Sequence, residues 1–166
     1  MATEQEFDDY FASRWQRLVR SAVLLGCERS EAEDLVQSTM VTCLRKWSKV
    51  SAAEDRDAYV HRILINTFLA SRRRRWTGER PSSELPEQAS TDETHAVDIA
   101  DAVLRCLARL NDEHRTVVVL RYYAHLTEQQ MATALGVPAG TVKSRLARAV
   151  KALAEDPHMI ELRGAS

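Results

Sequence analysis

The sequence predicts an all-α protein made of two small helical domains joined by a flexible linker. Apolar residues recur every three or four positions along most of the 166 residues, and no run alternates with period two for long enough to indicate a strand. One stretch breaks this pattern. Residues 77–94, "TGERPSSELPEQASTDET", contain two prolines, little apolar content and mostly acidic charge, which is the composition of a linker. We place the domain boundary there.

Three helices are expected before the linker. The first ends at Gly26, which suits a helix stop, and the second begins with a capping box formed by Ser30 and Glu33. The third begins near Asp55 or Asp57 and ends in "RRRRW". Their apolar faces, which are expected to share one core, consist of Phe7, Phe11, Trp15, Leu18, Ala22 and Leu25, then Leu35, Val36, Cys43, Leu44 and Trp47, then Tyr59, Val60, Ile63, Leu64 and Phe68.

Two further helices are expected directly after the linker. Apolar residues at helical spacing over 97–110 predict the fourth helix, and "HRTVVVLRYYAHL" predicts the fifth. Three consecutive valines favour a strand by propensity alone. Packing often overrides propensity, however, and no partner strand is visible, so a helix is the better prediction.

A helix-turn-helix is predicted over 127–153. Thr127 and Gln130 form a capping box, Gly136 suits the left-handed end of the first helix, and Pro138 suits the first turn of the second. The packing side of the second helix consists of Val142, Leu146, Ala149, Val150 and Leu153, whereas its other side carries Lys143, Ser144, Arg145, Arg148 and Lys151.

The basic side of this helix suggests DNA binding. A helix pair of this kind lays its second helix in the major groove, where Arg and Lys bond to phosphates or guanine edges. Small residues at Ala139, Gly140 and Ala147 allow close approach. The alternative is that the Lys and Arg side chains only form the solvent-exposed face of an amphipathic helix. The caps, the turn glycine and the absence of acids before Glu155 favour DNA binding.

Composition limits the class of protein without naming it. The formal net charge is −1, from 23 basic and 24 acidic residues, and it argues neither for nor against nucleic-acid binding. The acidic start "MATEQEFDDYF" lacks a signal-peptide core, and no stretch approaches the roughly 20 apolar residues of a membrane span. We therefore expect a cytoplasmic protein with no membrane insertion.

Enzyme chemistry, metals and cofactors are not expected. The five histidines form no metal-ligand spacing with cysteines or paired acids, and no nucleophile motif or glycine-rich phosphate loop occurs. Cys27, Cys43 and Cys106 lack a C-x-x-C pair and are interpreted as buried thiols. Redox sensing by Cys27 and Cys43 remains the alternative.

Three segments together resemble the bacterial sigma-70 family, especially its extracytoplasmic-function (ECF) group. The segment "TEQQMATALGVPAGTVKSRLARAVKAL" resembles the family's fourth conserved region, "EAEDLVQSTMVTCLRKW" its core-polymerase-binding helix and "AYVHRILINTFLASRRRR" its promoter-melting helix. The resemblance covers roughly residues 5–155. It divides the chain into region 2 (1–76), the acidic linker (77–96), region 4 (97–156) and a short tail (157–166).

The resemblance implies a transcription initiation factor that binds core RNA polymerase through its β′ coiled coil and β flap and directs it to two promoter elements. By position in the motif, Asp34, Leu35 and Gln37 contact the β′ coiled coil. The acids at the start of this helix also sit where the helix dipole favours them, so the alternative is a purely local stabilisation of about 0.3–1 kcal/mol each. An anti-sigma protein is a permitted partner.

The promoter-melting segment supplies the expected minus-ten contacts. Arg62 and Asn66 lie one helical turn apart and would engage an unpaired base and its phosphate, next to a base pocket formed by about residues 49–56. Tyr59 is either a stacking residue or, more consistent with its apolar stripe, a core residue. Residues Arg72, Arg73, Arg74 and Arg75 form a salt-dependent backbone anchor, with a hydrated charge run as the alternative.

The expected minus-thirty-five contacts lie on the second helix of the helix-turn-helix. They are Thr141, Lys143, Ser144, Arg145, Arg148 and Lys151. Ala147 and the segment "QQMATAL" depart from the family's usual pattern, so the promoter preference does not transfer. The acidic linker is expected to thread the polymerase near the RNA exit path.

Two other classes of protein are weighed against this interpretation. A response-regulator output domain has a similar helix-turn-helix but does not account for "AEDLVQ" or the arginine run. An all-helical adaptor that binds partners through its acidic second helix would fail to bind promoter DNA together with core polymerase.

Overall fold

The computed structural model describes residues 3–77 and 95–164, and every regular element within these ranges is helical. In chain order the elements are α1 (Glu4–Leu24), α2 (Arg29–Arg45), α3 (Trp47–Ser51), α4 (Arg56–Trp76), α5 (His95–Arg109), α6 (Asp112–Val118), the π-helix η1 (Val119–Tyr123), α7 (Glu128–Leu135), α8 (Ala139–Glu155) and α9 (Pro157–Gly164). The predicted fold class is confirmed. The predicted linker lies almost entirely at 78–94, outside the described residues. Within the described ranges, the helices are too short or too polar to cross a membrane.

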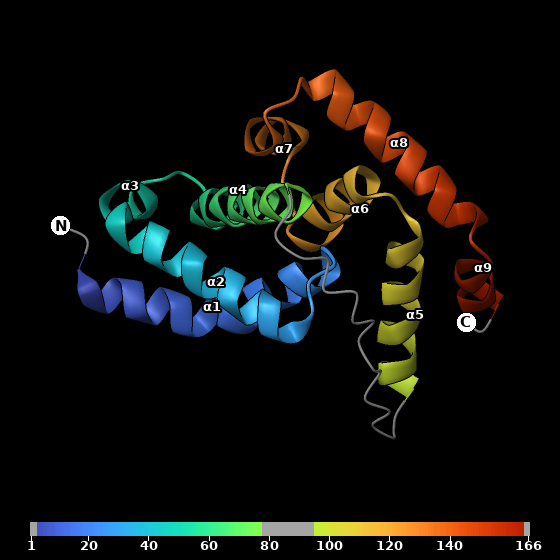
Figure 1. Ribbon diagram of the computed structural model, residues 1–166, viewed down its shortest axis with the longest axis horizontal. Coiled ribbons are helices and arrows are strands. Elements are labelled where there is room, and N and C mark those ends of the chain that lie inside the picture. Colours follow the sequence, from blue (N-terminus) through green and yellow to red (C-terminus); the bar gives the residue numbers. More distant parts are fainter. Residues whose placement is uncertain (1–2, 78–94, 165–166) are drawn as a thin grey trace.

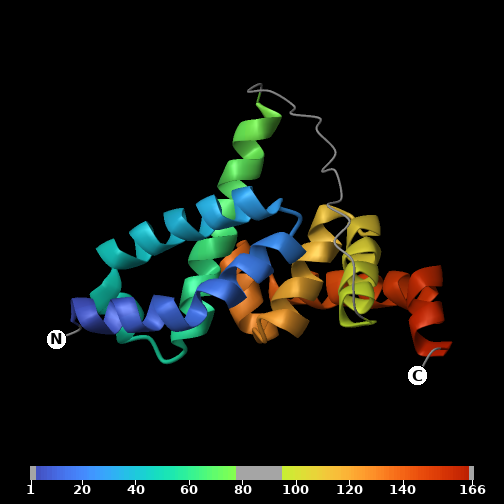
Figure 2. The same cartoon turned by 90° about the horizontal axis from the view of Figure 1, so that it is seen from below.

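The first half of the chain is a helical bundle. Helices α1 and α2 lie side by side, and α4 packs against α2 (Figure 1). The last turns of α4, which carry the arginine run, extend past the neighbouring helices (Figure 2). Near the N-terminus the core is aromatic, because Phe7 packs on Phe11 at 4.7 Å between ring centroids and edge-on against Trp47 at 5.2 Å. The predicted shared core of this half is present.

Two helix ends agree with the sequence prediction and one does not. Gly26 follows α1 with φ of 115°, and Asp55 caps α4 by accepting a hydrogen bond from the Ala58 amide. The predicted capping box of Ser30 and Glu33 is wrong. Because Glu28 is already extended, α2 begins at Arg29, and Ser30 lies inside its first turn.

The second half contains the predicted helix-turn-helix, formed by α7 and α8. The Thr127 and Gln130 capping box is present, and Pro138 is the residue immediately before α8. The valine run is helical, since α6 continues directly into η1 and residues 116–120 are all buried. Burial of the β-branched side chains therefore overrides their strand propensity. The short tail forms the helix α9.

Both halves contribute to one continuous cluster of buried residues. Helix α4 packs against α7, and α1 contacts η1 (Figure 1). Among residues 3–77 and 95–164, three hydrogen bonds cross this boundary. They run from Arg17 to the Tyr123 carbonyl (3.2 Å), from Arg115 to the Leu24 carbonyl (2.7 Å) and from Gln130 to Asp55 (3.2 Å).

Two glycines of the helix-turn-helix give a matched test of its backbone. Gly136 has φ of 66°, and no atom lies within 4 Å of the place that a Cβ would take, so Gly136→Ala adds backbone strain without a clash. We expect a loss of about 1 kcal/mol in the free energy of unfolding. Gly140→Ala, inside α8 and equally open, is expected to gain roughly 0.5–1 kcal/mol. Chemical denaturation measures both, and a shift of the same sign for the two variants would refute the assigned turn.

Candidate nucleic-acid interface

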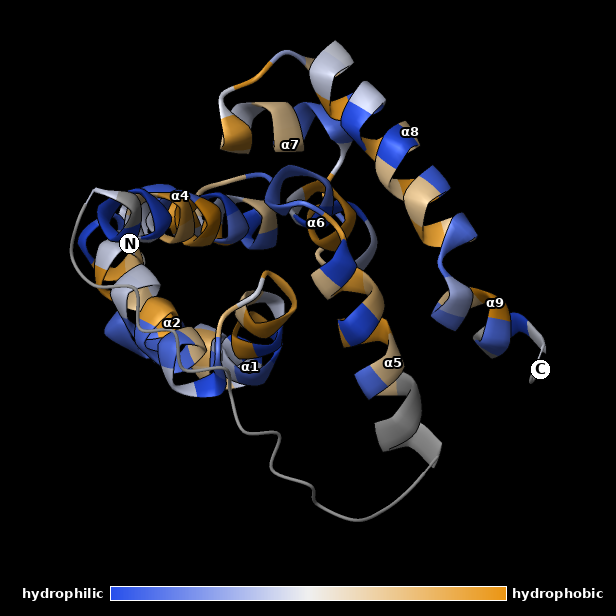
Figure 3. Cartoon of the chain, turned by 45° about the vertical axis from the view of Figure 1, so that its right-hand side comes forward, coloured by the Kyte–Doolittle hydropathy of each residue, from blue (hydrophilic) through white to orange (hydrophobic). Residues whose placement is uncertain are grey.

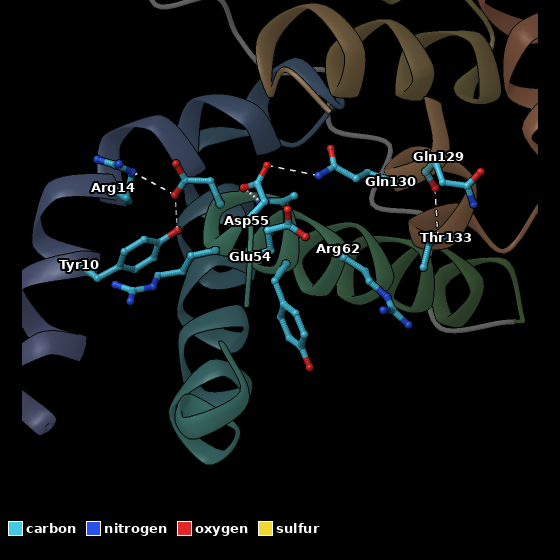
Figure 4. A pocket seen from close by; sticks show the side chains of 12 residues that line it. Tyr10, Arg14, Glu54, Asp55, Arg62, Gln129, Gln130 and Thr133 are labelled. Atoms are coloured by element: carbon cyan, nitrogen blue, oxygen red, sulfur yellow. Dashed lines mark hydrogen bonds and ion pairs between the residues drawn. The ribbon is translucent and has the colours of Figure 1, made fainter. Parts of the chain in front are cut away.

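A cavity of about 830 Å³ lies at the N-terminal end of α4. Its walls come from α1, from residues 54–59 and Arg62, and from α7 (Figure 4). The sequence predicted a base pocket at about residues 49–56, and the cavity overlaps the end of this range. The wall supplied by Gln129, Gln130 and Thr133 of α7 was not predicted, because nothing local in the sequence brings α7 to this place.

The inner side of the cavity holds a hydrogen-bonded charge cluster. Asp57 accepts hydrogen bonds from the Tyr10 hydroxyl (2.5 Å) and from Arg14 Nε (3.1 Å) (Figure 4). Partial burial alone would raise the pKa of Asp57, but these two bonds together with the positive charge of Arg14 outweigh it and lower the pKa. Arg56 lies over the rings of both Tyr10 and Trp47, at 5.6 Å and 5.4 Å. Cations and aromatic faces of this kind suit a nucleotide base and its phosphate.

His61 fixes α4 against α1 beneath this cavity. Its side chain is buried, Nδ1 lies 2.9 Å from the Asp57 carbonyl and Nε2 lies 3.2 Å from the Ser21 hydroxyl. Because a carbonyl only accepts, Nδ1 carries the proton, and Nε2 accepts from Ser21. Burial lowers the pKa of His61, more than the nearby carbonyl and carboxylate of Asp57 raise it.

These two pKa shifts predict a two-step loss of stability on acidification. The unfolded chain protonates His61 below about pH 6.5 while the folded chain does not, so the free energy of unfolding falls as pH drops from there towards the folded pKa. Asp57, whose folded pKa is lowered, adds a second loss below about pH 4. Denaturant unfolding from pH 8 to pH 3 measures both. His61→Gln should remove the first step and keep the second, and an unchanged profile would contradict this account.

The predicted minus-ten residues of α4 differ in their exposure to solvent. Arg62 and Asn66 are both exposed, as a shared outward face requires. Tyr59 is half-buried and packs against the core while also lining the cavity. Arg62 extends along the cavity wall (Figure 4). The structure therefore brings Tyr59 and Arg62 together at one cavity, with Asn66 one turn further along the same helix.

The four arginines of the run, residues 72–75, have different surroundings. Arg73 and Arg74 are exposed, whereas Arg72 lies over the Phe68 ring at 5.0 Å. Arg75 pairs with Glu31 of α2 at 2.8 Å. Arg75 therefore has an acidic partner within the fold. Its partner is 44 positions away, so sequence proximity did not reveal the ion pair.

Helix α2 has a mixed outward face. Asp34 and Gln37 are exposed, while Leu35 is 8% exposed and belongs to the core. Val41 and Leu44 are about half exposed, at 50% and 51%. The prediction that Leu44 is buried is wrong, because the helix turns this residue to the side that carries Asp34 and Gln37. The spacing of Asp34, Gln37, Val41 and Leu44 was the signal that identifies this face.

Helix α8 presents a basic outer side. Lys143, Ser144, Arg148 and Lys151 are exposed, and Thr141 is half-buried. Arg145 instead turns towards Glu113 of α6, with Nη2 3.2 Å from the carboxylate. The packing side consists of Val142, Leu146 and Ala149, with Leu153 partly buried. Val150 is 42% exposed, contrary to the prediction. Hydrophilic and hydrophobic segments alternate along α8 in Figure 3.

The cysteines are poorly suited to redox chemistry. Cys43 and Cys106 are buried and Cys27 is half-buried, and none of them forms a disulfide. Burial raises the pKa of Cys27 to about 11 and that of Cys43 to about 12, so both remain thiols at neutral pH. Within residues 3–77 and 95–164, no three His, Cys, Asp or Glu side chains are placed to hold a metal ion.

Comparison with known proteins identifies both halves. Residues 11–77 match the family model "Sigma-70 region 2", and residues 100–153 match "Sigma-70, region 4". The chain is 35% identical over 151 residues to the RNA polymerase sigma-E factor of Streptomyces avermitilis, covering 91% of this chain and 84% of the relative. It is also 35% identical over 155 residues to the ECF RNA polymerase sigma factor SigL of Mycobacterium tuberculosis H37Rv, covering 89% and 84%.

Solved structures share the fold. The sigma factor RpoE of Bartonella quintana, in complex with the anti-sigma factor NepR, superposes with a TM-score of 0.71 at 24% identity over 91% of this chain and 96% of that one. CnrH, in complex with the cytosolic domain of CnrY, gives 0.63 at 22% identity over 92% and 88%. With both regions in the family's order and this identity over most of its length, the chain belongs to the sigma-70 family and is an ECF-type sigma factor that directs transcription initiation.

Proposed function

We propose that α2 binds core RNA polymerase while α4 and α8 each contact one promoter element. The observation that carries this proposal is the pairing of two surfaces in one chain. One is the charged and aromatic cavity beside the exposed polar face of α4, and the other is the basic outer side of α8. A simple helix-turn-helix regulator needs only the second surface.

The polymerase-binding surface is the outward face of α2. Asp34 and Gln37 supply polar contacts to the β′ coiled coil, and Val41 and Leu44 supply the apolar area that a stable interface needs. Leu35 acts from the core by fixing the helix that presents them. Region 4 contacts the β flap.

The minus-ten surface is the exposed side of α4 together with the cavity at its N-terminal end. Arg62 and Asn66 bond to an unpaired base and its phosphate, and Tyr59 forms the wall against which the base lies. Arg72, Arg73, Arg74 and Arg75 contact the DNA backbone. Arg73 and Arg74 contribute most, because Arg75 is paired with Glu31 and Arg72 lies over the Phe68 ring.

The minus-thirty-five surface is the outer side of α8, placed in the major groove. Lys143, Arg148 and Lys151 are exposed cations, and Thr141 and Ser144 are short hydroxyl donors. Arg145 contributes to DNA binding only after its ion pair with Glu113 breaks and its guanidinium contacts DNA instead. The geometry supports phosphate contacts along the helix and base contacts at its centre.

The chain acts by binding, and the polymerase supplies the chemistry. The protein therefore acts in the cytoplasm, where RNA polymerase binds the chromosome. An anti-sigma protein is a further expected partner, because both fold neighbours were solved in complexes with proteins of this kind or with a cytosolic partner domain.

The test is transcription from fragmented genomic DNA by core polymerase, with and without this chain, followed by mapping of the RNA 5′ ends. We expect new start sites that share two spaced upstream motifs. Polymerase that is active with another sigma factor but gives no new start sites with this chain would refute the proposal. Asp34→Ala with Gln37→Ala should lower the affinity for core polymerase, measured with a fluorescent chain, whereas Gln16→Ala on the exposed side of α1 should not.

A further inference from the structure

A basic and aromatic groove of about 460 Å³ lies where α1 meets η1 (Figure 2). It shares no lining residue with the cavity at the start of α4, since it is lined by Gln16, Arg17, Arg20, Tyr122, Tyr123 and His125. Arg17, Arg20 and His125 are exposed, and within the described part of the chain no acidic side chain lines the groove. The charge that suits this basic groove is therefore negative.

An apolar cavity of about 220 Å³ adjoins the basic groove. Tyr122 and Tyr123 line both of them, and the other walls of the cavity are apolar residues of the helices around it, among them Leu24, Val103 and Met159. An apolar cavity of about 150 Å³ already holds a benzene-sized molecule. The apolar cavity therefore has room for part of an aliphatic chain.

The groove and the cavity follow one another along the contact between α1 and residues 118–125. Arg17, Arg20 and Leu24 share one face of α1, because they lie three and four positions apart. Arg17 donates to the Tyr123 carbonyl at 3.2 Å, at the basic end of the contact, whereas Leu24 lines the apolar cavity. The contact therefore changes from basic to apolar over roughly 10 Å of helix.

The backbone between the groove and the cavity is unusual. The element η1 is a π-helix, a form that occurs frequently at functional sites. His125 has φ of 56°, a left-handed conformation that is uncommon away from glycine, and the Tyr122 side chain is 60% exposed. Strained backbone of this kind clusters at ligand sites, and the polymerase and promoter surfaces proposed above make no use of these residues.

We propose that the basic groove and the apolar cavity together form a binding site for a free amphiphilic anion, an aliphatic chain with one carboxylate or phosphate head. The chain lies in the cavity, and the head bonds to Arg17 and Arg20. Burial of the chain supplies hydrophobic free energy, and the guanidinium groups select the charge of the head. A free molecule fits better than a membrane surface, because Leu107, Val118 and Val119 of the cavity walls are buried and cannot insert into a bilayer.

The test is calorimetric titration of the full chain with decanoate below its micelle concentration. Decanol and decyltrimethylammonium serve as probes with the same chain length and a neutral or positive head, and amide chemical shifts locate the site. Arg20→Ala removes one cation of the groove, and Val103→Phe fills part of the cavity. The matched control Arg29→Ala also removes an exposed arginine, one that pairs with Glu33 inside α2.

Decanoate is expected to bind saturably and to shift the amides of residues 16–24 and 118–125. Binding should weaken about tenfold for decanol and for decanoate with Arg20→Ala, because each change removes one side of a charge-assisted hydrogen bond. Val103→Phe should also weaken decanoate binding, whereas Arg29→Ala should bind as wild type does. The comparison of the three probes uses the unaltered chain, so it stands even where a variant fails to fold.

Equal binding of the three probes, or shifts confined to other residues, would show detergent-like association and overturn the proposal. Sedimentation of the chain with phosphatidylglycerol vesicles, while free decanoate leaves the shifts unchanged, would assign the groove to a membrane surface and would also overturn it. The proposed ligand site does not rest on the proposed promoter contacts. Initiation at mapped start sites tests those contacts separately.

Discussion

Replacing Asn66 with alanine is expected to reduce promoter opening about tenfold or more without weakening polymerase binding. Asn66 is exposed on α4, four positions after Arg62, beside the cavity proposed to take the minus-ten strand. An amide that bonds to a base edge contributes about 1–3 kcal/mol to recognition. Folding should not suffer, because alanine is the better helix former by up to about 0.7 kcal/mol at an exposed position.

Permanganate reactivity of thymines in the minus-ten element measures opening, and anisotropy of the labelled chain measures polymerase binding. Gln16→Ala is the matched control, since it removes an exposed side-chain amide from α1 that does not line the cavity. Normal opening by Asn66→Ala would show that the melting surface has been assigned to the wrong residues.

Replacing Arg148 with alanine is expected to weaken recognition of the upstream element by about 1–3 kcal/mol, or roughly five- to 150-fold. Arg148 is exposed on α8, and the packing of this helix depends on Val142, Leu146 and Ala149 instead. The folded structure should therefore be unchanged, and the loss should appear only when the upstream element is present.

Arg145→Ala provides the contrast on the same helix. Its guanidinium is bonded to Glu113 and must leave that partner to reach DNA, so its replacement should cost less than that of Arg148. Competition binding to upstream elements with single base changes distinguishes base reading from phosphate contact. Equal losses on every sequence, with a salt slope reduced by about one, would show that Arg148 contacts only the backbone.

The helices were largely predictable because their signals are local. Periodic apolar residues, the caps at Thr127 and Asp55 and the left-handed Gly136 each act within one or two turns. Short α3 was missed because five residues carry too little periodicity. The Ser30 capping box was wrong because the turn after Gly26 places the N-cap at Glu28, two positions earlier than the motif suggests.

The site was predictable only where one helix carries it. Lys143 and Arg148 share a face of α8, and Arg62 and Asn66 share a face of α4, so helical spacing was sufficient. The contacts of Arg75 with Glu31 and of Arg115 with Leu24 join positions 44 and 91 residues apart. Such pairs depend on packing between helices, which a single sequence does not specify.

We propose that one chain contacts two promoter elements at once while it is bound to polymerase. The most direct test is run-off transcription from a mapped promoter whose spacer is lengthened by about five base pairs, which rotates the upstream element by about half a helical turn. The account predicts that initiation falls to the level seen when the upstream element is deleted. Undiminished initiation from the lengthened promoter would contradict simultaneous recognition by α4 and α8.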